Sequence, residues 1–358
     1  MATNLLKEAR MKTAFIFGFF IAAAITMAAS AAYANDSMAR VGAGGIRLIK
    51  SEHIRMLEEV LEISTRKVSV KYRFLNESDH DIRTTVAFPM PPYHWTGGQV
   101  WLDENQKPVS TFKAFVDGRP VSTKTVTKAL VGDVDVTQRL RRAGLSDAKI
   151  RTFAGCREGP EKIVSDFTQK QKKMVKRLNG GEESCPPWTV ASTLVWEQRF
   201  PAHKEVVVEH RYAPFFGILY DAPYQKRFGY RLDSACPVAG AAAGTDEACL
   251  DAAFRKIVDD RIKALAAGGA DMVYVTLHDV EYILGTGRNW KGPIGVFTLR
   301  IKKDSPDQLV SLCLPGELKK VDSTSYEFTQ KDFVPQDRLV VYFYDVGPDV
   351  AYEVGRQN

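Results

Sequence analysis

The chain has 358 residues and a formal net charge of +6, and 26% of its residues are charged. This length fits one large domain or two ordinary ones. The charge excess is mild, and no basic cluster is interleaved with aromatic residues. The composition therefore argues against a nucleic-acid-binding protein.

Residues 1–34 have the three parts of a secretory signal peptide. These parts are a basic region, an apolar run and a small-x-small cleavage site, formed by Lys7, Arg10 and Lys12, by residues 14–29 and by Ala32-Tyr33-Ala34. We expect cleavage after Ala34 and export to the periplasm as a soluble protein. The apolar run is borderline for a membrane span and no later stretch is long enough, so we expect no stable span after cleavage. Met11 is an alternative start to Met1, because Lys12 alone would still supply a short basic region.

The segment after the leader is expected to change from an exposed lead-in to strands. Residues 35–45 are small and polar, which is typical of an exposed segment. Residues 46–63 fit either two short strands or a helix, because GIRLI reads as a strand and EHIRMLEEVLEI has a helix-favouring composition. We predict two strands, since the β-rich neighbourhood overrides local propensity.

The clearest pattern lies at residues 66–91, where two alternating runs flank a polar turn at residues 76–81. The apolar rows are Val68, Val70, Tyr72 and Phe74 in the first run, and Ile82, Thr84, Val86 and Phe88 in the second. Period-two runs around an Asn/Asp/Ser-rich turn predict a β-hairpin with one buried face. Lys71, Arg73 and Arg83 are then expected to face outward.

A second hairpin is predicted at residues 194–212 by the same pattern. Its inward rows are Leu194, Trp196, Gln198 and Phe200, then Val206, Val208, His210 and Tyr212. Residues 111–116 predict a further strand, and Asp117-Gly118 after it is a strong turn signal before Val121.

Three helices are predicted among these strands. A short one begins after Asp133 or Asp135 and ends at Gly144. Residues 161–178 predict a second helix, whose outer face carries the basic residues Lys170, Lys172, Lys173, Lys176 and Arg177. This face fits contact with an anionic surface or an ordinary solvated helix, and we favour the second. Residues 246–267 predict an amphipathic third helix that paired glycines close.

The rest of the chain is predicted to be β. Residues 213–243 are rich in Pro, Gly, Tyr and Ala and are expected to form an irregular linker. Short strands separated by turn residues are predicted at 273–277, 281–284, 296–301, 309–314, 325–329 and 339–344. Regular short strands of this kind indicate a β-sandwich.

The predicted fold class is mainly β with inserted helices. We expect a signal peptide at 1–34 and an N-terminal antiparallel β-sandwich with a helical insertion at 35–215. A helix with a second, C-terminal antiparallel β region is expected at 216–358.

Five cysteines follow the leader, and an oxidising compartment would permit disulfides. Cys156 and Cys185 bracket a predicted helix, and Cys236 and Cys249 bracket an Ala/Gly-rich loop. We predict these two pairs, because short loops are natural places for a cross-link. Sequence alone does not fix the connectivity, and Cys249 with Cys313 is a rival pair. No CxxC occurs, so neither a zinc knuckle nor a thioredoxin-type site is supported.

Several phrases together resemble a known family. They are Ala34-Asn35-Asp36-Ser37, Gly42-Ala43-Gly44-Gly45, Val86-Ala87-Phe88-Pro89-Met90-Pro91, Trp196-Glu197-Gln198-Arg199-Phe200-Pro201, Glu209-His210-Arg211-Tyr212, Tyr282-Ile283-Leu284, Gly287-Arg288-Asn289-Trp290-Lys291-Gly292-Pro293-Ile294-Gly295 and Leu309-Val310-Ser311-Leu312-Cys313. Over nearly the whole mature chain this set resembles the exported bacterial family called domain of unknown function 4424. The motifs look structural rather than catalytic, and the resemblance implies no particular activity.

The N-terminal part also resembles, more distantly, the first strands of the vault/inter-alpha-trypsin domain, which is a β-sandwich. Residues 74–91 have that domain's order of strand, polar turn and strand ending in Phe-Pro-x-Pro, and residues 115–121 resemble it too. This likeness implies a fold and says little about function.

The usual catalytic motifs are missing from the sequence. There is no Gly-x-Ser-x-Gly, and the stretch from His278 to Tyr282 has the wrong spacing for helical zinc ligands. Gly285-x-Gly287 lacks the ending of a phosphate-binding loop. His203 and His210 lie on one predicted hairpin and could approach each other, but structural roles are favoured over a metal site. We expect no cofactor and no metal.

Two stretches are candidate binding sites. The first is Tyr93, His94 and Trp95, which follow stiffening prolines in a predicted loop, and the second is Arg288, Asn289 and Trp290 between two strands. Trp, Tyr and Arg are common anchors for partners. The alternative, which we favour for each Trp, is that it fills the core at one end of the sandwich.

Together these features predict an exported periplasmic protein that binds or scaffolds without catalysis. The expected partner is an envelope protein or a glycan. The alternative is a periplasmic hydrolase with an unrecognised carboxylate pair. Asp259-Asp260 is a poor pair of this kind, because adjacent residues on a helix point apart.

Overall fold

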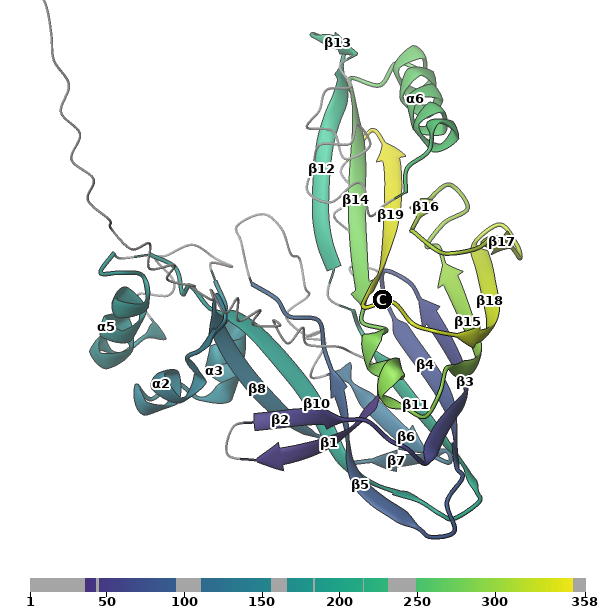
Figure 1. Cartoon of the computed structure of the whole chain (residues 1–358). Coiled ribbons are helices and arrows are strands. Elements are labelled where there is room, and N and C mark those ends of the chain that lie inside the picture. Colours follow the sequence, from purple (N-terminus) through teal and green to yellow (C-terminus); the bar gives the residue numbers. More distant parts are fainter. Residues whose placement is uncertain are drawn as a thin grey trace, which may run out of the picture. The chain divides into compact units, whose positions relative to one another are not determined.

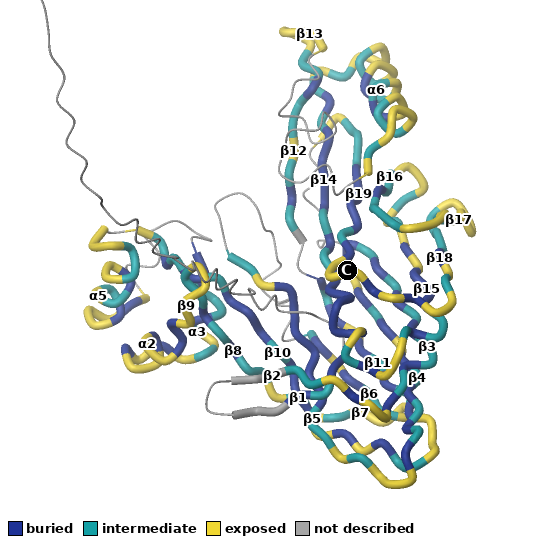
Figure 2. Tube along the Cα trace, viewed as in Figure 1, coloured by how far each residue is buried: buried dark blue, intermediate teal, exposed yellow. Residues whose placement is uncertain are grey.

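The computed structural model of the chain describes residues 36–42, 45–94, 111–155, 166–182, 184–214, 216–230 and 249–349. These residues form a mainly β structure with inserted helices, as predicted (Figure 1). The strands are distributed over three sheets. Buried residues follow the strands, and exposed ones gather on the outer sides of the helices and at the connections (Figure 2).

The largest sheet draws strands from both halves of the chain. Its eight strands follow the order β17 (Lys319–Lys320), β18 (Ser325–Phe333), β15 (Ile294–Lys302), β3 (Ile54–Ile63), β4 (Val68–Asn76), β11 (Glu205–Tyr212), β6 (Lys113–Val116) and β7 (Arg119–Val121). β15 lies parallel to β3, and the other pairs are antiparallel. The predicted boundary between residues 215 and 216 therefore does not separate the sheets, because strands from both sides of it share this one.

The second sheet contains the two strands nearest the N-terminus of the described residues. Its six strands follow the order β2 (Gly45–Ile49), β1 (Ser37–Gly42), β5 (Ile82–Pro89), β10 (Thr189–Phe200), β8 (Lys124–Val131) and β9 (Val134–Asp135). The two strands predicted within residues 46–63 are confirmed as β2 and β3. The expected exposed lead-in is wrong, because β1 pairs with β5 and Ser37 is buried. Small polar residues gave no sign of this long-range pairing.

The helical insertion lies between β9 and β10. It contains α2 (Thr137–Arg142), α3 (Asp147–Thr152) and α5 (Gln169–Leu178). Asp135, one of the two predicted caps, accepts a hydrogen bond from the Thr137 backbone N–H at 2.9 Å. Thr168 and Gln171 form a capping box at the start of α5. The helices are anchored in the core by Leu140, Ile150 and Val175.

The two predicted hairpins are β-arches, in which the two strands of each unit belong to different sheets. β4 pairs with β3 and β11, whereas β5 pairs with β1 and β10. The second arch, β10 and β11, is split in the same way, so the two arches stack on each other. The inward rows are as predicted, since Phe74 and Phe88 are fully buried and Val86 is 1% exposed. Alternation shows which face of a strand is buried but not which strand lies beside it, and the predicted pairing was wrong for that reason.

The third sheet has five strands, in the order β13 (Gly229–Tyr230), β12 (Phe216–Gln225), β14 (Met272–Tyr282), β19 (Leu339–Gly347) and β16 (Leu309–Ser311). α6 (Ala252–Ala267) packs on it through Val258 and Ile262. The predicted irregular linker at residues 213–243 contains β12, which is a correction. Its Pro223 lies where the pairing with β14 is irregular, so the strand tolerates the missing N–H.

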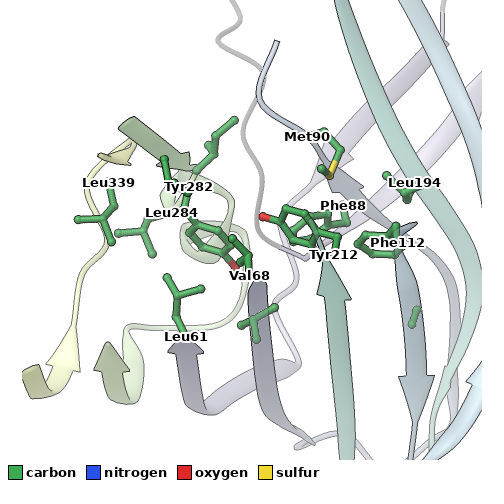
Figure 3. Close-up of a cluster of buried hydrophobic side chains, with 14 of the residues drawn as sticks. Leu61, Val68, Phe88, Met90, Phe112, Leu194, Tyr212, Tyr282, Leu284 and Leu339 are labelled. Atoms are coloured by element: carbon green, nitrogen blue, oxygen red, sulfur yellow. The ribbon is translucent and has the colours of Figure 1, made fainter. Parts of the chain in front are cut away.

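One hydrophobic cluster joins side chains from all three sheets. It includes Phe74 of β4, Phe88 of β5 and Val341 of β19. In Figure 3, Phe88, Phe112 and Tyr212 lie against one another, with ring centroids 5.3–5.9 Å apart. The sheets are therefore held together by aromatic packing around Phe88.

A β-bulge in β3 changes which of its residues face inward. The register with β4 shifts between Met56 and Glu58, so that Glu59 is buried beside Leu61. Gly295 of β15 lies opposite the bulge, and a Cβ there would lie 2.6 Å from the Leu57 carbonyl oxygen. Only glycine fits this contact without a backbone shift.

A disulfide joins Cys249, just before α6, to Cys313, just after β16. The prediction of at least one disulfide is confirmed, but the predicted pairing of Cys249 with Cys236 is wrong. α6 and β16 both pack on β19, which brings the two cysteines to a Cα–Cα distance of 5.4 Å. Cys185 is also disulfide-bonded, and its predicted partner Cys156 lies outside the described residues, as does Cys236.

Candidate binding site

The loop at residues 284–291, one of the two predicted binding stretches, links segments that are far apart in the sequence. It consists of Leu284, a 3-10 helix, η2 (Gly285–Asn289), and the two residues after it. The Asn289 carbonyl accepts a hydrogen bond from the Ser51 N–H at 2.7 Å, and the Lys291 N–H donates to the Ile54 carbonyl at 2.9 Å. The loop therefore fixes the start of β3.

Arg288 connects this loop to residues 335–338. Its guanidinium donates to the Pro335 carbonyl at 3.1 Å and forms an ion pair with Asp337. The backbone N–H groups of Leu284 and Gly285 donate to the Asp337 carbonyl at 3.1 and 3.0 Å. Side-chain and backbone contacts thus hold the 335–338 segment in one conformation.

A pocket of about 360 Å³ lies on that segment. Its lining residues are Cys313, Gln336, Asp337, Arg338, Leu339 and Val340. Leu339 is buried and Val340 half-buried, whereas Gln336, Asp337 and Arg338 are exposed. The pocket therefore combines an apolar floor beside the disulfide with a polar rim that offers an amide, a carboxylate and a guanidinium.

Trp290 and Asn289 point to the interior and the N-terminal strand instead. The Trp290 side chain is 1% exposed, and its ring centroid lies 4.5 Å from that of Phe74. Its indole N–H donates to the Asp36 carbonyl at 2.6 Å, and the Asn289 amide donates to the Ser37 hydroxyl at 3.1 Å. Trp290 therefore fills the core, which is the alternative that the sequence favoured.

The side chain of Asp36 forms a buried pair with His210. The His210 Nε2 lies 2.8 Å from the Asp36 Oδ1, and both side chains are fully buried. The His210 ring is enclosed by the rings of Phe88, Phe112 and Trp196, whose centroids lie 5.0–5.1 Å away. Burial raises the pKa of Asp36 above its ordinary value, and His210 opposes this shift.

A second buried polar group lies close by. The hydroxyls of Tyr72 and Tyr282 are 2.8 Å apart, and the Tyr282 hydroxyl donates to Glu59 Oε1 at 3.4 Å. Burial raises the pKa of both tyrosines far above the usual value, with nearby charges adding to the shift. These hydroxyls stay protonated at neutral pH, so they can donate hydrogen bonds inside the core.

The first predicted binding stretch is tied to the helical insertion. The Tyr93 hydroxyl donates to the Arg151 carbonyl at 2.7 Å, and burial raises the pKa of this hydroxyl. The His94 Nδ1 lies 2.9 Å from the Trp188 carbonyl. Trp95 lies outside the described residues. Tyr93 and His94 thus support the packing of α3 and β10, and the structure does not bring them to the Arg288 loop by any described contact.

The other candidate groups for chemistry lie apart from one another. His203 pairs with Asp79 on the surface, far from the environment of His210. Asp259 and Asp260 pair separately with Lys263 and Lys256, so they point apart as expected. Within the described ranges, no group of three His, Cys, Asp or Glu side chains has the geometry to hold a metal ion.

Sequence reasoning missed Asp36, Glu59 and the pocket rim. The one sequence signal for Asp36 was its place in the family phrase Ala34-Asn35-Asp36-Ser37. Glu59 sits in an apolar alternation that the bulge at Leu57 interrupts. The rim residues Gln336 and Arg338 carry no local pattern, because the disulfide and β19 bring them together with Cys313.

The chain was compared with curated proteins and with solved structures. No curated protein matches the chain. Among solved structures, a "putative nutrient binding protein" from Legionella pneumophila subsp. pneumophila str. Philadelphia 1 is similar at 12% identity, covering 87% of this chain and 70% of that chain, with a TM-score of 0.40.

Two further findings concern the chain as a whole. Among the helices of the described ranges, none is both long and apolar enough to span a membrane. The family described as Domain of unknown function (DUF4424) matches residues 34–342, which confirms the resemblance read from the sequence, and the chain belongs to this family.

Proposed function

We propose that the chain is an exported periplasmic binding module that holds a polar envelope glycan in the pocket at residues 336–340. The observation that carries this proposal is the combination of an apolar floor with a rim of three consecutive polar side chains. Ligand sites are typically concave and apolar with a few well-placed polar groups, and the volume of about 360 Å³ lies at the small end of their range.

The chemistry of the rim favours a ligand with hydroxyl and carboxylate groups. The Arg338 guanidinium suits a carboxylate, because it can donate two parallel hydrogen bonds. The Asp337 carboxylate and the Gln336 amide suit hydroxyl and acetamido groups. An amino sugar that carries a carboxylate has all of these groups, so a peptidoglycan fragment is the proposed class.

The rim is held in place before a ligand arrives. Arg288 holds the Pro335 carbonyl and the Asp337 carboxylate, and the backbone N–H groups of Leu284 and Gly285 hold the Asp337 carbonyl. Binding then costs less ordering of the segment, which favours affinity. Arg288 acts here as a positioning residue, since it does not line the pocket.

Export is supported by three independent features. Residues 1–34 have the pattern of a signal peptide, and the family match begins at residue 34. Cys249 is exposed, and the Cys249–Cys313 disulfide suits an oxidising compartment. N-terminal sequencing of exported protein should begin at Asn35, whereas an intact N-terminus in the membrane fraction would overturn this part of the proposal.

The module is proposed to be a β-sandwich of the six-stranded and eight-stranded sheets. Two ring contacts between the sheets support this. Phe88 of the six-stranded sheet contacts His210 of the eight-stranded sheet, and Phe200 of the six-stranded sheet contacts Phe74 of the eight-stranded sheet. Alternating inward rows on both sheets, as in β4 and in residues 196–200 of β10, are typical of such a packing.

Calorimetry with a soluble peptidoglycan disaccharide tests the binding proposal. Arg338→Ala should weaken binding of this probe by about tenfold, since it removes a charged hydrogen bond worth about 1.5–3 kcal/mol. Asp337→Asn should weaken it at least as much, because it also removes the ion pair that Asp337 forms with Arg288. Lys331→Ala, on exposed β18, is the matched control and should bind as the unaltered protein does. Equal affinity in all three variants, or no heat of binding in the unaltered protein, would contradict the proposal.

A further inference from the structure

The positive charge of the chain is concentrated in the helical insertion. Residues 137–182 carry twelve basic and five acidic side chains, an excess of seven, whereas the whole chain has a net charge of +6. The remainder of the protein is therefore close to neutral. A charge distribution this uneven creates a local positive potential that the net charge alone does not reveal.

Most of these cations face outward. Arg139 and Arg142 of α2 and Lys170, Lys173 and Arg177 of α5 are exposed, and none of the five has an acidic partner within the described residues. Arg141 differs, because it pairs with Asp147 at 2.8 Å. The outer sides of α2 and α5 are drawn as exposed in Figure 2.

The arrangement on α5 works against the stability of the helix itself. Lys170, Lys173 and Arg177 are three and four residues apart, so they share one face. Like charges at this spacing repel each other and destabilise a helix. The opposite side holds the helix down, because Val175 is buried in the core and the Gln171 amide donates to the Gly144 carbonyl at 2.8 Å. An external anionic surface would relieve the repulsion.

The composition of the face indicates what that surface is. α5 presents mostly lysine, which acts as a mobile point charge rather than as a fork for one particular anion. The face is convex and helical, and the pocket described above lies on other elements. Val134, which is 54% exposed on β9 just before α2, adds an apolar side chain at the start of the insertion. An insertion with several exposed cations and an exposed apolar side chain suits the headgroup layer of an anionic membrane.

We infer that the helical insertion docks the protein onto an anionic phospholipid surface. The contact is peripheral, through headgroup phosphates, and the pocket at residues 336–340 takes no part in it. This inference stands whether or not the pocket binds a glycan.

Vesicle sedimentation tests the inference with the full mature chain. The protein should sediment with vesicles of phosphatidylglycerol and phosphatidylcholine but not with pure phosphatidylcholine vesicles. Binding should be lost in 1 M salt, where the screening length falls to about 3 Å. The triple variant Lys170→Gln, Lys173→Gln and Arg177→Gln should bind at least about tenfold more weakly, because each cation near the surface contributes separately.

A matched triple variant separates the local surface from the total charge. Lys71→Gln, Lys113→Gln and Lys319→Gln remove the same charge from exposed positions on β4, β6 and β17, and binding should stay within about twofold. Equal loss in both triples, equal binding to neutral vesicles, or competition by soluble polyglutamate with no vesicle binding would overturn the inference. Circular dichroism and urea unfolding of both triples check that the fold is unchanged, since glutamine keeps the helix propensity.

Discussion

The side chain of Asn76 donates a hydrogen bond to the carbonyl of Phe200 at 2.9 Å and so ties the corner of the first β-arch to the second. The same amide donates to the His80 carbonyl at 2.8 Å, and its oxygen accepts from the Ser78 N–H and hydroxyl. Asn76 is fully buried. One side chain thus fixes the turn of one arch and its contact with the other.

Asn76→Ala should destabilise the protein by about 2–4 kcal/mol, because it leaves several buried polar groups without partners. The measurement is the unfolding free energy from urea titration. Asp79→Ala is the control in the same turn, since its carboxylate is 98% exposed and pairs with His203 at the surface. That variant should change stability by less than about 0.5 kcal/mol. Similar losses of unfolding free energy in Asn76→Ala and Asp79→Ala would show that the buried hydrogen bonds of Asn76 do not stabilise the arch.

Phe88→Ala should be among the costliest substitutions in the core. The Phe88 ring lies within 6.4 Å of the rings of Phe112, His210, Tyr212 and Tyr282. Its removal leaves a cavity among the sheets and should cost about 3–5 kcal/mol, whereas Lys71→Ala on the exposed face should cost less than about 0.5 kcal/mol. If denaturant melts showed equally mild effects for Phe88→Ala and Lys71→Ala, Phe88 would not be a core residue.

The sequence predicted strand positions and buried faces well, because both follow from the alternation of apolar and polar residues along each strand. Phe74, Val86 and Phe88 are inward, and Lys71 and Arg83 are exposed, as expected. The strand partners predicted within the hairpins at 66–91 and 194–212 were wrong, because a polar turn can either bring a strand back beside the previous strand or lead it into a second sheet. The turn at Asp117-Gly118 was predicted correctly, since β6 pairs with β7 across it. Only long-range contacts such as Asn76 to Phe200 decide between them.

The candidate site was harder to predict, because its parts meet only in the folded chain. Asp36 lies 174 residues from His210 and 254 from Trp290. The pocket combines Cys313 with residues 336–340. The sequence did identify Arg288, whose guanidinium holds the rim, although as a partner contact rather than as a positioning residue. The residue types at 288–290 indicated a binding role, but no local sequence pattern indicated which distant residues they contact.

Gly295→Ala should destabilise the protein by about 1–3 kcal/mol, the usual cost of an atom forced into a packed site. The new Cβ would meet the Leu57 carbonyl oxygen at 2.6 Å, and this oxygen belongs to the bulged backbone and cannot rotate away. Gly347→Ala is the matched strand control, because the nearest atom to its Cβ would be 3.8 Å away. Urea titration of both variants gives the comparison, and a neutral Gly295→Ala would mean that the bulge adjusts freely.

Asp36 should make stability fall as pH rises. Burial raises its pKa above the ordinary 3.8, so the folded protein holds this proton more tightly than the unfolded chain does. The contribution is fully present below the unfolded pKa and is lost as pH rises through the folded pKa. The unfolding free energy of the unaltered protein minus that of Asp36→Asn should therefore decrease as pH rises above the ordinary pKa of 3.8. A difference that grows with pH would show that attraction to His210 outweighs burial.

Cys313→Ser should lower the unfolding free energy by about 2–4 kcal/mol, because the lost disulfide closes a long loop and restricts the unfolded chain. The two cysteines are 64 residues apart in the sequence, and the loop contains α6, β14 and β15. Cys249→Ser and the double variant should lose the same unfolding free energy as Cys313→Ser, since all three variants remove one cross-link. Urea unfolding measures the losses, and non-reducing peptide mapping should recover Cys249 joined to Cys313. Recovery of Cys249 joined to Cys236, or a double variant much weaker than either single one, would contradict this pairing and with it the floor of the pocket.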